Sequence, residues 1–519
     1  MTFYEGVRVR LTVSDAGRVP LMAAAAALAA GLLAVAVGPL GLVAPLAVLA
    51  LLVVLSNPGI AVGLLVGCAI LFESSSPNVL HFATQQFHDP LPGHYGVLEA
   101  LMALATCAVL LDSIRRRRVP LRPAPFGPAL AALTLALLAG SVVGHFAGQG
   151  FNAITEQIRP VLPLIIVPWL VVNVVADRGQ VRAAIALLAM LTIVKAALGL
   201  VGVITHVGVV ANGTTITYYE PAANWLAMTF LLAMLAAAAR RLPTERAARW
   251  AVPLVLACLA LSLRRSFWLG AAAGALFVLI FATAPVGKRF LLPSAAVLAA
   301  AVLIAVSTGF AVDSQSPLGR RVESITPSRI VANPQDSYRL DEQKNVLAEI
   351  RSSPLVGLGL AVPWRETYPL SVTQVTQPGA GELYVHMAVL WFWLKLGVLG
   401  VIAYLGYMLT AIAAGIRVFR RHPDARIRAA GAGAAGGLLG LAVVEATATI
   451  LGTDLRTTVL VGCTVGLLSV ALGQIRSSAP VAPTFTVADP RPSQRDRRMR
   501  QPDRVRNVVP AYWRPDDVD

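Results

Sequence analysis

The chain has 519 residues, of which 56% are hydrophobic and only 13% charged, and its mean hydropathy is +0.70. A soluble protein usually carries about a quarter charged residues. Apolar runs close to membrane-spanning length cannot all be buried in one aqueous core, so they predict helices that face lipid. The net charge of +16 would suggest nucleic-acid binding in a soluble chain. Here the placement of the charges indicates topology instead, and no nucleic-acid partner is expected.

The predicted fold is all-α, a polytopic membrane protein with about 14 transmembrane helices and one long extracytoplasmic loop that contains short helices. Arg8, Arg10 and Arg18 precede the first apolar run, but no cleavage site with a soluble domain follows, so that run is interpreted as an anchor. The expected spans lie near 21–38, 40–55, 58–72, 95–111, 128–145, 160–176, 182–204, 222–239, 248–263, 267–284, 290–311, 386–416, 429–451 and 456–473.

These spans divide the chain into five parts. They are a cytoplasmic N-terminal segment (1–20), helices 1–11 (21–311), the extracytoplasmic loop (312–385), helices 12–14 (386–473) and a disordered basic cytoplasmic tail (474–519). The run over 386–416 is too long for one simple crossing, so we expect it to tilt or to begin as an interfacial helix. The sequence GAGAAGGLLG at 431–440 predicts a face of small residues for close helix packing.

The distribution of lysine and arginine among the short loops predicts the orientation. Alternate loops carry 18 basic residues, whereas the intervening loops carry four, which are Arg159, Arg264, Arg265 and Arg456. The 18 are Arg115, Arg116, Arg117, Arg118, Arg122, Arg178, Arg182, Arg240, Arg241, Arg246, Arg249, Lys288, Arg289, Arg417, Arg420, Arg421, Arg426 and Arg428. Because basic loops remain cytoplasmic, both termini are predicted to lie in the cytoplasm of a bacterial-type plasma (inner) membrane, with the long loop outside.

The few cations on the predicted outer side need an explanation. Arg159 opens a span, and Arg264 and Arg265 lie in a tight hairpin between two spans. Each arginine could snorkel to the interface or pair with a nearby acid, such as Glu156 for Arg159. Because three of them lie beside a long loop with further cations, we favour a shared anionic ligand, since a guanidinium group binds phosphate oxygens in pairs.

The long loop contains a segment, PQDSYRLDEQKNVLAEIRSS, that predicts an amphipathic helix over 337–351. Leu340, Leu347 and Ile350 are expected on or near one face. Arg339 falls in the first turn, where the positive helix end disfavours a cation, so we expect it to contact an anion from elsewhere. His386 stands where the next apolar run begins, either as a hydrogen-bonded anchor or as a catalytic group.

Two charged residues are predicted within the membrane, Lys195 and Glu445, where an isolated charge is costly. They could pair with each other in the bundle interior, which we favour, or form a proton path as in a transporter. His81, His88 and His94 share one loop, but their spacing matches no metal signature, so no metal site is predicted.

Five short stretches follow one another in a fixed order across roughly residues 95–410, and their cations share one predicted side of the membrane. In this order they resemble the O-antigen ligase and O-antigen polymerase superfamily of membrane glycosyltransferases. The matching positions are Arg159 in QIRPVLPLI, Asn224 in YYEPAANWLAMTFLLAML, Arg264 and Arg265 in RRSFWLG, Arg339 in YRLDEQKNVLAEIRSSPLVGLG, and His386 in HMAVLWFWLKLGVLG.

The resemblance implies a donor glycan on a polyprenyl diphosphate, an acceptor hydroxyl on a glycan or lipid, and no cofactor. It implies that Arg159, Arg265 and Arg339, assisted by Arg264, bind the diphosphate without a metal. His386 is implied as the general base, because imidazole titrates near neutrality, and direct displacement would invert the anomeric carbon.

The chain departs from the family pattern at three positions. Arg264 stands where Ser is usual, Met387 replaces the usual Asn after the histidine, and Lys395 stands near the usual acid. Three functions therefore remain in view. We favour a polymerase or ligase of lipid-linked glycans in cell-surface polysaccharide biosynthesis, and the alternatives are a transporter or flippase, supported by Lys195 and Glu445, and a non-catalytic scaffold.

Overall fold

The computed structural model describes residues 43–72, 96–117, 119, 126–211, 214–218, 220–282, 334–370 and 384–477, all within one unit that spans Met1–Ser477. Several of the predicted segments and residues lie outside the described residues. These are the segment 1–20, the spans over 21–38 and 290–311, the histidines His81, His88 and His94, and the tail beyond residue 477.

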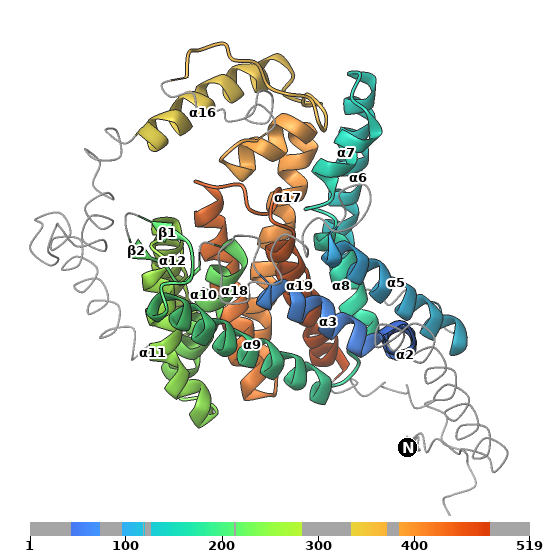
Figure 1. Cartoon of the computed structure of the whole chain (residues 1–519), viewed down its shortest axis with the longest axis vertical. Helices are drawn as coiled ribbons and strands as arrows, with labels where there is room; N and C mark the ends of the chain where they lie inside the picture. The colour runs from blue at the N-terminus through green and yellow to red at the C-terminus, as the bar shows by residue number, and fades with distance from the viewer. Residues whose placement is uncertain are drawn as a thin grey trace, which may run out of the picture. The chain divides into compact units, whose positions relative to one another are not determined.

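The described part is almost entirely helical, as predicted (Figure 1). The exception is a hairpin of two-residue strands, β1 (Val210–Ala211) and β2 (Thr214–Thr215), which pair antiparallel. The helices are α2 (Val43–Ser56), α3 (Pro58–Leu71), α5 (Val97–Arg115), α6 (Gly127–Phe146), α7 (Phe151–Ile158), α8 (Pro163–Val174), α9 (Arg178–Ile204), α10 (Pro221–Ala239), α11 (Arg246–Leu261), α12 (Arg265–Ala282), α16 (Pro334–Ser352), α17 (Ala388–Arg421), α18 (Ala425–Glu445) and α19 (Leu455–Ser477).

Short polar side chains fix where several of these helices begin. Asp177 accepts a hydrogen bond from the Gln180 amide at 2.9 Å, and Asp424 accepts from the amides of Arg426 and Ile427 at 2.9 and 3.1 Å. Each bond satisfies an amide that the first helical turn leaves without an intrahelical acceptor. The starts of α9 and α18 are therefore encoded locally.

The span count of 14 is not confirmed. Within the described residues, eight helices are long and apolar enough to cross a membrane, and two bent pairs would raise the number to ten. One pair bends by 111° between α2 and α3, and the other bends by 55° between α7 and α8. In the second pair, α8 has only 12 residues and begins at Pro163, so the predicted span over 160–176 is half of a broken element.

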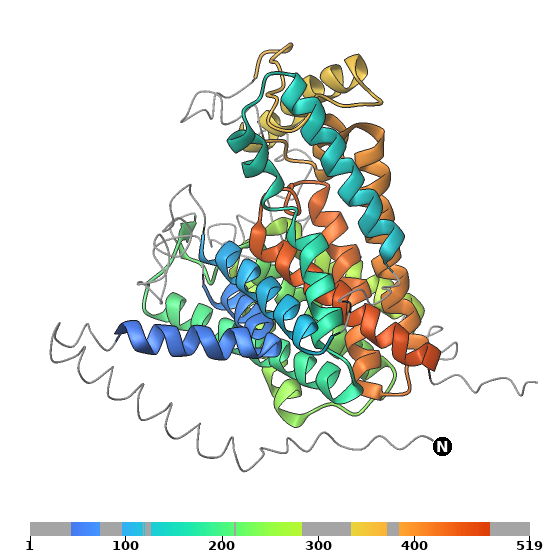
Figure 2. The same ribbon diagram turned by 90° about the vertical axis from the view of Figure 1, so that its right-hand side faces the viewer.

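Helix α18 packs against α10, α12 and α17 with very little space between the backbones (Figures 1 and 2). A Cβ added at Gly440 would lie 2.6 Å from the Gly270 carbonyl oxygen of α12, and one at Gly415 of α17 would lie 2.7 Å from the Gly431 carbonyl oxygen. The predicted small-residue face is therefore confirmed. Without side chains at these positions, the helices gain close van der Waals contact along their length.

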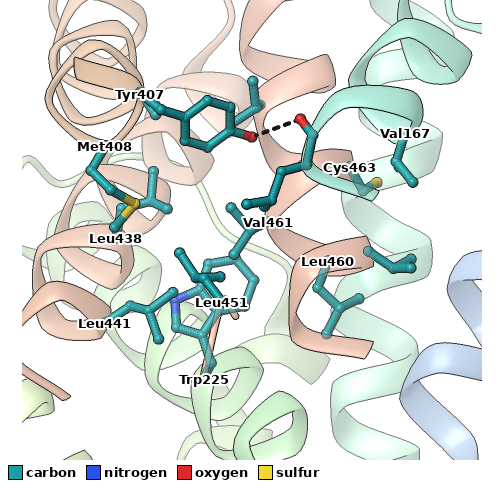
Figure 3. Close-up of a cluster of buried hydrophobic side chains, with 14 of the residues drawn as sticks. Val167, Trp225, Tyr407, Met408, Leu438, Leu441, Leu451, Leu460, Val461 and Cys463 are labelled. Atoms are coloured by element: carbon teal, nitrogen blue, oxygen red, sulfur yellow. Dashed lines mark hydrogen bonds between the residues drawn. The ribbon is translucent and has the colours of Figure 1, made fainter. Parts of the chain in front are cut away.

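Buried hydrophobic side chains from these helices, α8 and α19 fill the core, and the polar atoms of two of its large aromatic residues are hydrogen-bonded (Figure 3). The indole Nε1–H of Trp225 donates to the Gly437 carbonyl at 3.0 Å, and the Tyr407 hydroxyl donates to the Leu164 carbonyl at 3.3 Å. A buried aromatic with an unpaired polar atom would be costly in an apolar interior, so both bonds stabilise the packing.

Helix α17 is broken at Gly397, where φ is 65° and ψ is −163°. The chain at 355–362 packs into the break, because the Leu358 amide donates to the Leu394 carbonyl at 2.7 Å and the Val398 amide to the Leu355 carbonyl at 3.2 Å. Buried Lys395 also donates to the Val362 carbonyl. The run that was predicted to be too long for one crossing is therefore two helical pieces joined at a glycine.

Two ion pairs bring three of the predicted cytoplasmic loops to one end of the bundle. Arg182 lies 2.8 Å from Asp424, and Arg426 lies 2.7 Å from Glu245. These contacts join the start of α9, the α17–α18 turn and the α10–α11 connection. The opposite ends of α17 and α18 carry His386 and Glu445, and Arg265 and Arg456 lie at the beginnings of α12 and α19.

The break in α17 depends on a glycine, and we expect Gly397→Ala to lower the melting temperature of the detergent-purified protein by several degrees. A left-handed backbone costs a residue with a Cβ on the order of 1–3 kcal/mol, and the added Cβ would also overlap the Leu355 carbonyl oxygen. Gly406→Ala in the same helix is the control, because nothing lies within 4 Å of its Cβ position. Equal melting temperatures for the two variants would contradict this account of the break.

Candidate functional site

Helix α16 lies over the beginning of α17 and forms one wall of the candidate site (Figure 1). It was predicted over 337–351 and is confirmed over Pro334–Ser352. The predicted face is wrong, however, because Leu340 and Leu347 are 45% and 39% exposed. The earlier start also places Arg339 in the second turn, so the unfavourable first-turn position inferred for it does not apply.

The buried face of α16 is partly polar, and each polar group on it is bonded to another part of the chain. Asn345 is fully buried, and its Oδ1 accepts from the amides of Thr367 and Tyr368 at 2.6 Å, while its Nδ2 donates to the Tyr368 carbonyl at 2.9 Å. The Asn345 amide therefore bonds backbone groups as a neighbouring strand would. These bonds hold the segment after Trp364 against α16.

Glu342 of α16 binds His386 in two ways. Its Oε2 lies 2.9 Å from the imidazole Nδ1 and also accepts the His386 backbone amide at 2.9 Å. The carboxylate side chain is 1% exposed and the imidazole is 22% exposed. This arrangement fixes the ring orientation. With an ionised carboxylate, Nδ1 carries the proton and Nε2 has the free lone pair.

Two tyrosine rings lie against the imidazole at right angles. The ring centroid of His386 is 4.7 Å from that of Tyr384 and 5.9 Å from that of Tyr338. Burial raises the pKa of Tyr384 to about 12, with further increases from Glu342 and Glu445 and a smaller opposing effect from Arg339. The phenol is therefore neutral near pH 7. The charges of both carboxylates and of the arginine act on its pKa.

The three residues 384–386 are held by three different parts of the chain. Trp364 Nε1–H donates to the Tyr384 carbonyl at 3.1 Å, Thr449 Oγ1–H donates to the Val385 carbonyl, and Glu342 accepts the His386 amide. Met387, where the family usually has Asn, is the N-cap of α17 and makes no side-chain cap bond. Long-range bonds therefore position the histidine.

Thr449 belongs to the α18–α19 loop over 446–454, and Glu445 organises that loop. Oε1 of Glu445 accepts the amides of Ile450 and Leu451, both at 2.9 Å, whereas Oε2 has no hydrogen-bond partner among the described residues. The predicted pairing of Glu445 with Lys195 is therefore not the arrangement observed.

Arg159 lies in a different corner of the same end of the bundle. Its Nε donates to Glu99 Oε1 at 3.0 Å, so its partner is the carboxylate at the start of α5, not Glu156. A cavity of about 200 Å³ lies beside it, lined by Glu99, Glu156, Thr453 and Leu455 among others. Because Thr453 is in the 446–454 loop, this loop reaches from the Arg159 cavity to Val385 beside the histidine.

Arg265 begins α12, directly after Arg264 in the hairpin that was predicted between two spans, and both side chains are half-buried. Helices α12 and α18 pack antiparallel with Gly270 opposite Gly440 and Gly274 opposite Gly436. Continuing this register places Arg265 at the level of Glu445. The hairpin therefore lies at the same end of the bundle as the histidine.

Lys195 belongs to a buried ionic cluster. Glu220, at the N-cap of α10, lies 2.5 Å from Arg456 Nη1 and 3.7 Å from Lys195 Nζ, and all three side chains are 2–3% exposed. Asp454 lies 3.5 Å from Arg456 Nη2. Among the described residues, two cations and two carboxylates meet here. Asn224, one turn into α10, is fully buried and donates to the Glu220 carbonyl at 2.8 Å.

The comparison with known families bears on this end of the molecule. Residues 250–405 match the family described as O-antigen ligase. No curated protein matches the chain significantly.

The O-antigen ligase match confirms the resemblance inferred from the motifs. The matched region contains Arg264, Arg265, Arg339, Glu342 and His386, whereas Arg159, Lys195, Asn224 and Glu445 lie outside it. Together with the apolar helices, the match identifies a membrane protein with an O-antigen-ligase-like region. No group of three or more possible metal-ligating His, Cys, Asp or Glu side chains occurs in the part of the chain that the structure describes.

Of the predicted site residues, the structure places His386 against Tyr384, whose pKa the charges of Arg339 and Glu445 also shift, and it places Arg159 and Lys195 in two separate clusters. Sequence reasoning missed Glu342, which faces the histidine from 44 residues earlier in the chain. A polar residue on the buried side of an amphipathic helix is the signal that could have indicated it.

The balanced cluster around Glu220 predicts a large stability difference between two similar substitutions. Glu220→Gln leaves two buried cations beside one carboxylate, which is expected to cost about 3–5 kcal/mol. Glu245→Gln removes an exposed ion pair with Arg426, which is worth less than about 1 kcal/mol. Thermal unfolding of the two purified variants measures the difference, and similar melting temperatures would show that the cluster is not structural.

Proposed function

We propose that this protein is a glycosyltransferase that moves a glycan from a polyprenyl diphosphate carrier to an acceptor hydroxyl at the outer face of a bacterial plasma membrane, in cell-surface polysaccharide biosynthesis. The observation that carries this proposal is the pairing of His386 with buried Glu342, inside the region that matches the O-antigen ligase family. The pairing provides an oriented general base at the end of the bundle that also carries Arg265 and Arg339.

His386 acts on the acceptor. Glu342 accepts a hydrogen bond from Nδ1–H, which stays on the ring, so the lone pair of Nε2 can take the proton from the acceptor hydroxyl. The hydroxyl oxygen then forms a bond to the anomeric carbon as the bond from that carbon to the diphosphate oxygen breaks. The electron pair leaves with the polyprenyl diphosphate, and a direct displacement of this kind inverts the anomeric configuration. The resulting imidazolium is stabilised by Glu342 until it loses its proton.

The arginines stabilise the diphosphate as it leaves, without a metal. Arg339 and Arg265, assisted by Arg264, lie at the same end of the bundle as His386 and can bind phosphate oxygens through two N–H groups each. Arg159 is salt-bridged to Glu99. Its part in donor binding therefore requires the diphosphate to compete with that carboxylate from the adjoining cavity.

The contacts of the other intramembrane charges support an enzyme over a transporter. Lys195 lies in a balanced ionic cluster with Glu220 and Arg456, and one oxygen of Glu445 accepts two backbone amides of the loop beside His386. Both residues therefore have structural partners. The orientation follows from the positive-inside rule, with both termini cytoplasmic and the histidine outside.

The first test is the lipid-linked glycan profile of cells that lack the protein, complemented with wild type or with His386→Ala. If the protein is a polymerase, we expect cells that lack it to accumulate single repeat units on the carrier. If it is a ligase, we expect them to accumulate long chains on the carrier. Only the wild type should reverse the change, because losing a general base costs roughly 10²–10⁴ in rate. Full restoration by His386→Ala would end the proposed catalytic role and favour the transporter or scaffold.

A second test separates the role of Glu342 from helix stability. With purified protein and a lipid-linked donor, Glu342→Gln should lower kcat roughly tenfold or more, with little change in KM for the donor, since the imidazole loses the charge that orients it. Glu349→Gln on the same helix is the control, because no contact of its side chain is described. A fall in both variants, or in KM alone, would contradict an orienting role.

A further inference from the structure

A second cavity lies near the other end of the bundle, between α9, α10, α18 and α19. Its volume is about 270 Å³, and its lining includes Leu188, Trp225, Ala233, Ala434 and Leu460. Trp225 and Leu460 can be located in Figure 3. The cavity has no role in the proposed glycan transfer, since its mouth is lined by Arg182, Glu245 and Arg426, which belong to the connections opposite His386.

The wall of this cavity suits a hydrocarbon chain and not a sugar or nucleotide. Among its lining residues, the hydroxyls of Thr192 and Thr464 donate to carbonyls of their own helices, Leu188 at 2.7 Å and Leu460 at 2.9 Å, whereas the buried Thr229 hydroxyl has no hydrogen-bond partner among the described residues. Most of the remaining wall is aliphatic or aromatic. A polar ligand would lose its hydration here without gaining enough hydrogen bonds.

The mouth of the cavity suits an anion. Arg182 and Arg426 line it, and their side chains are 49% and 58% exposed in ion pairs with Asp424 and Glu245. Exposed pairs of this kind are weak, so a phosphate can compete for the guanidinium groups. Three helices, α9, α11 and α18, also begin at this end, and their positive ends add to the attraction for an anion.

The charges around the mouth have an excess of cations. The connections that meet there carry the arginines Arg178, Arg182, Arg246, Arg249, Arg426 and Arg428 and the acids Asp177, Asp424 and Glu245. A ligand that fits both features has an apolar chain and a negatively charged head group close to the membrane surface, which describes an anionic phospholipid.

We propose that this cavity binds one acyl chain of an anionic phospholipid, with the phosphate held by Arg182 and Arg426 at its mouth. The bound lipid fills the space that α9 leaves beside α10, α18 and α19, and so stabilises the packing of α9. The site is separate from the histidine site, and the proposal does not depend on the glycosyltransferase function.

The test uses the full-length protein reconstituted in phosphatidylcholine vesicles that contain one-fifth phosphatidylglycerol. After extraction in a mild detergent, the phospholipid retained by the protein is measured by mass spectrometry. Wild type is expected to retain phosphatidylglycerol several-fold above its share in the vesicle. Arg182→Gln combined with Arg426→Gln should abolish this enrichment, and Ala430→Phe, which fills the cavity, should remove the retained lipid.

A matched control distinguishes this site from general surface charge. Arg115→Gln combined with Arg117→Gln removes the same charge from exposed positions at the end of α5, outside both the cavity lining and the connections that meet at its mouth, and should keep the enrichment. Loss of enrichment in this control would overturn the proposal. So would wild-type protein that retains phosphatidylcholine and phosphatidylglycerol equally, each relative to its share in the vesicle. Preferential retention of a polyprenyl phosphate, when that lipid is included, would also overturn it.

A measurement on wild type alone keeps the proposal testable if a variant fails to fold. Phosphatidylglycerol added to the detergent-purified protein should raise its melting temperature by several degrees, because a ligand of the native state stabilises it by mass action. Inorganic phosphate and phosphatidylcholine should not. An equal rise with inorganic phosphate would mean that the mouth binds a free anion and that the cavity is not a lipid site.

Discussion

The close approach of α18 to its neighbours is the constraint on which the rest of the structure depends. Glycines at facing positions let the backbones of α12, α17 and α18 touch, and a side chain at these positions would clash in this register. That register sets the height of Glu445 at the end of α18. Glu445 then shapes the loop that follows, and Thr449 of that loop binds the peptide group before His386. The packing of apolar helices thus determines where the imidazole lies at one end of the bundle.

Charged side chains are exposed at one end of the bundle and buried with their partners at the other. At the end with the predicted cytoplasmic loops, ion pairs are exposed and contribute little to stability, so their arginines remain available to lipid head groups. At the opposite end, Lys195, Glu220 and Arg456 are removed from solvent and must balance one another. The positive-inside rule concerns the first kind of charge. Arg456 is a charge of the second kind. It can lie at the end where the positive-inside rule disfavours arginine, because its carboxylate partner Glu220 is part of the fold.

Local sequence signals predicted the helices and many of their ends, since apolar runs and capping side chains act within a few residues. The same signals could not predict the bends. The 111° angle between α2 and α3 and the position of the break at Gly397 depend on what packs beside them, whereas a hydropathy profile gives the length of an apolar run and not the direction of its helices. The partners of the charged residues could not be predicted from local sequence either. Arg159 pairs with Glu99, which is 60 residues away, and the nearer Glu156 only lines the adjoining cavity.

The surroundings of His386 show why one departure from the family motif need not disturb the site. An Asn after the histidine could cap the following helix, whereas Met387 cannot. In this chain the preceding peptide groups are instead held by Trp364, Thr449 and Glu342, from three separate elements. Three bonds from different directions restrict the backbone more than a single local cap, because each opposes a different displacement. The orientation of the imidazole is then determined by the packing of α16 and the 446–454 loop, without a side-chain cap from Met387.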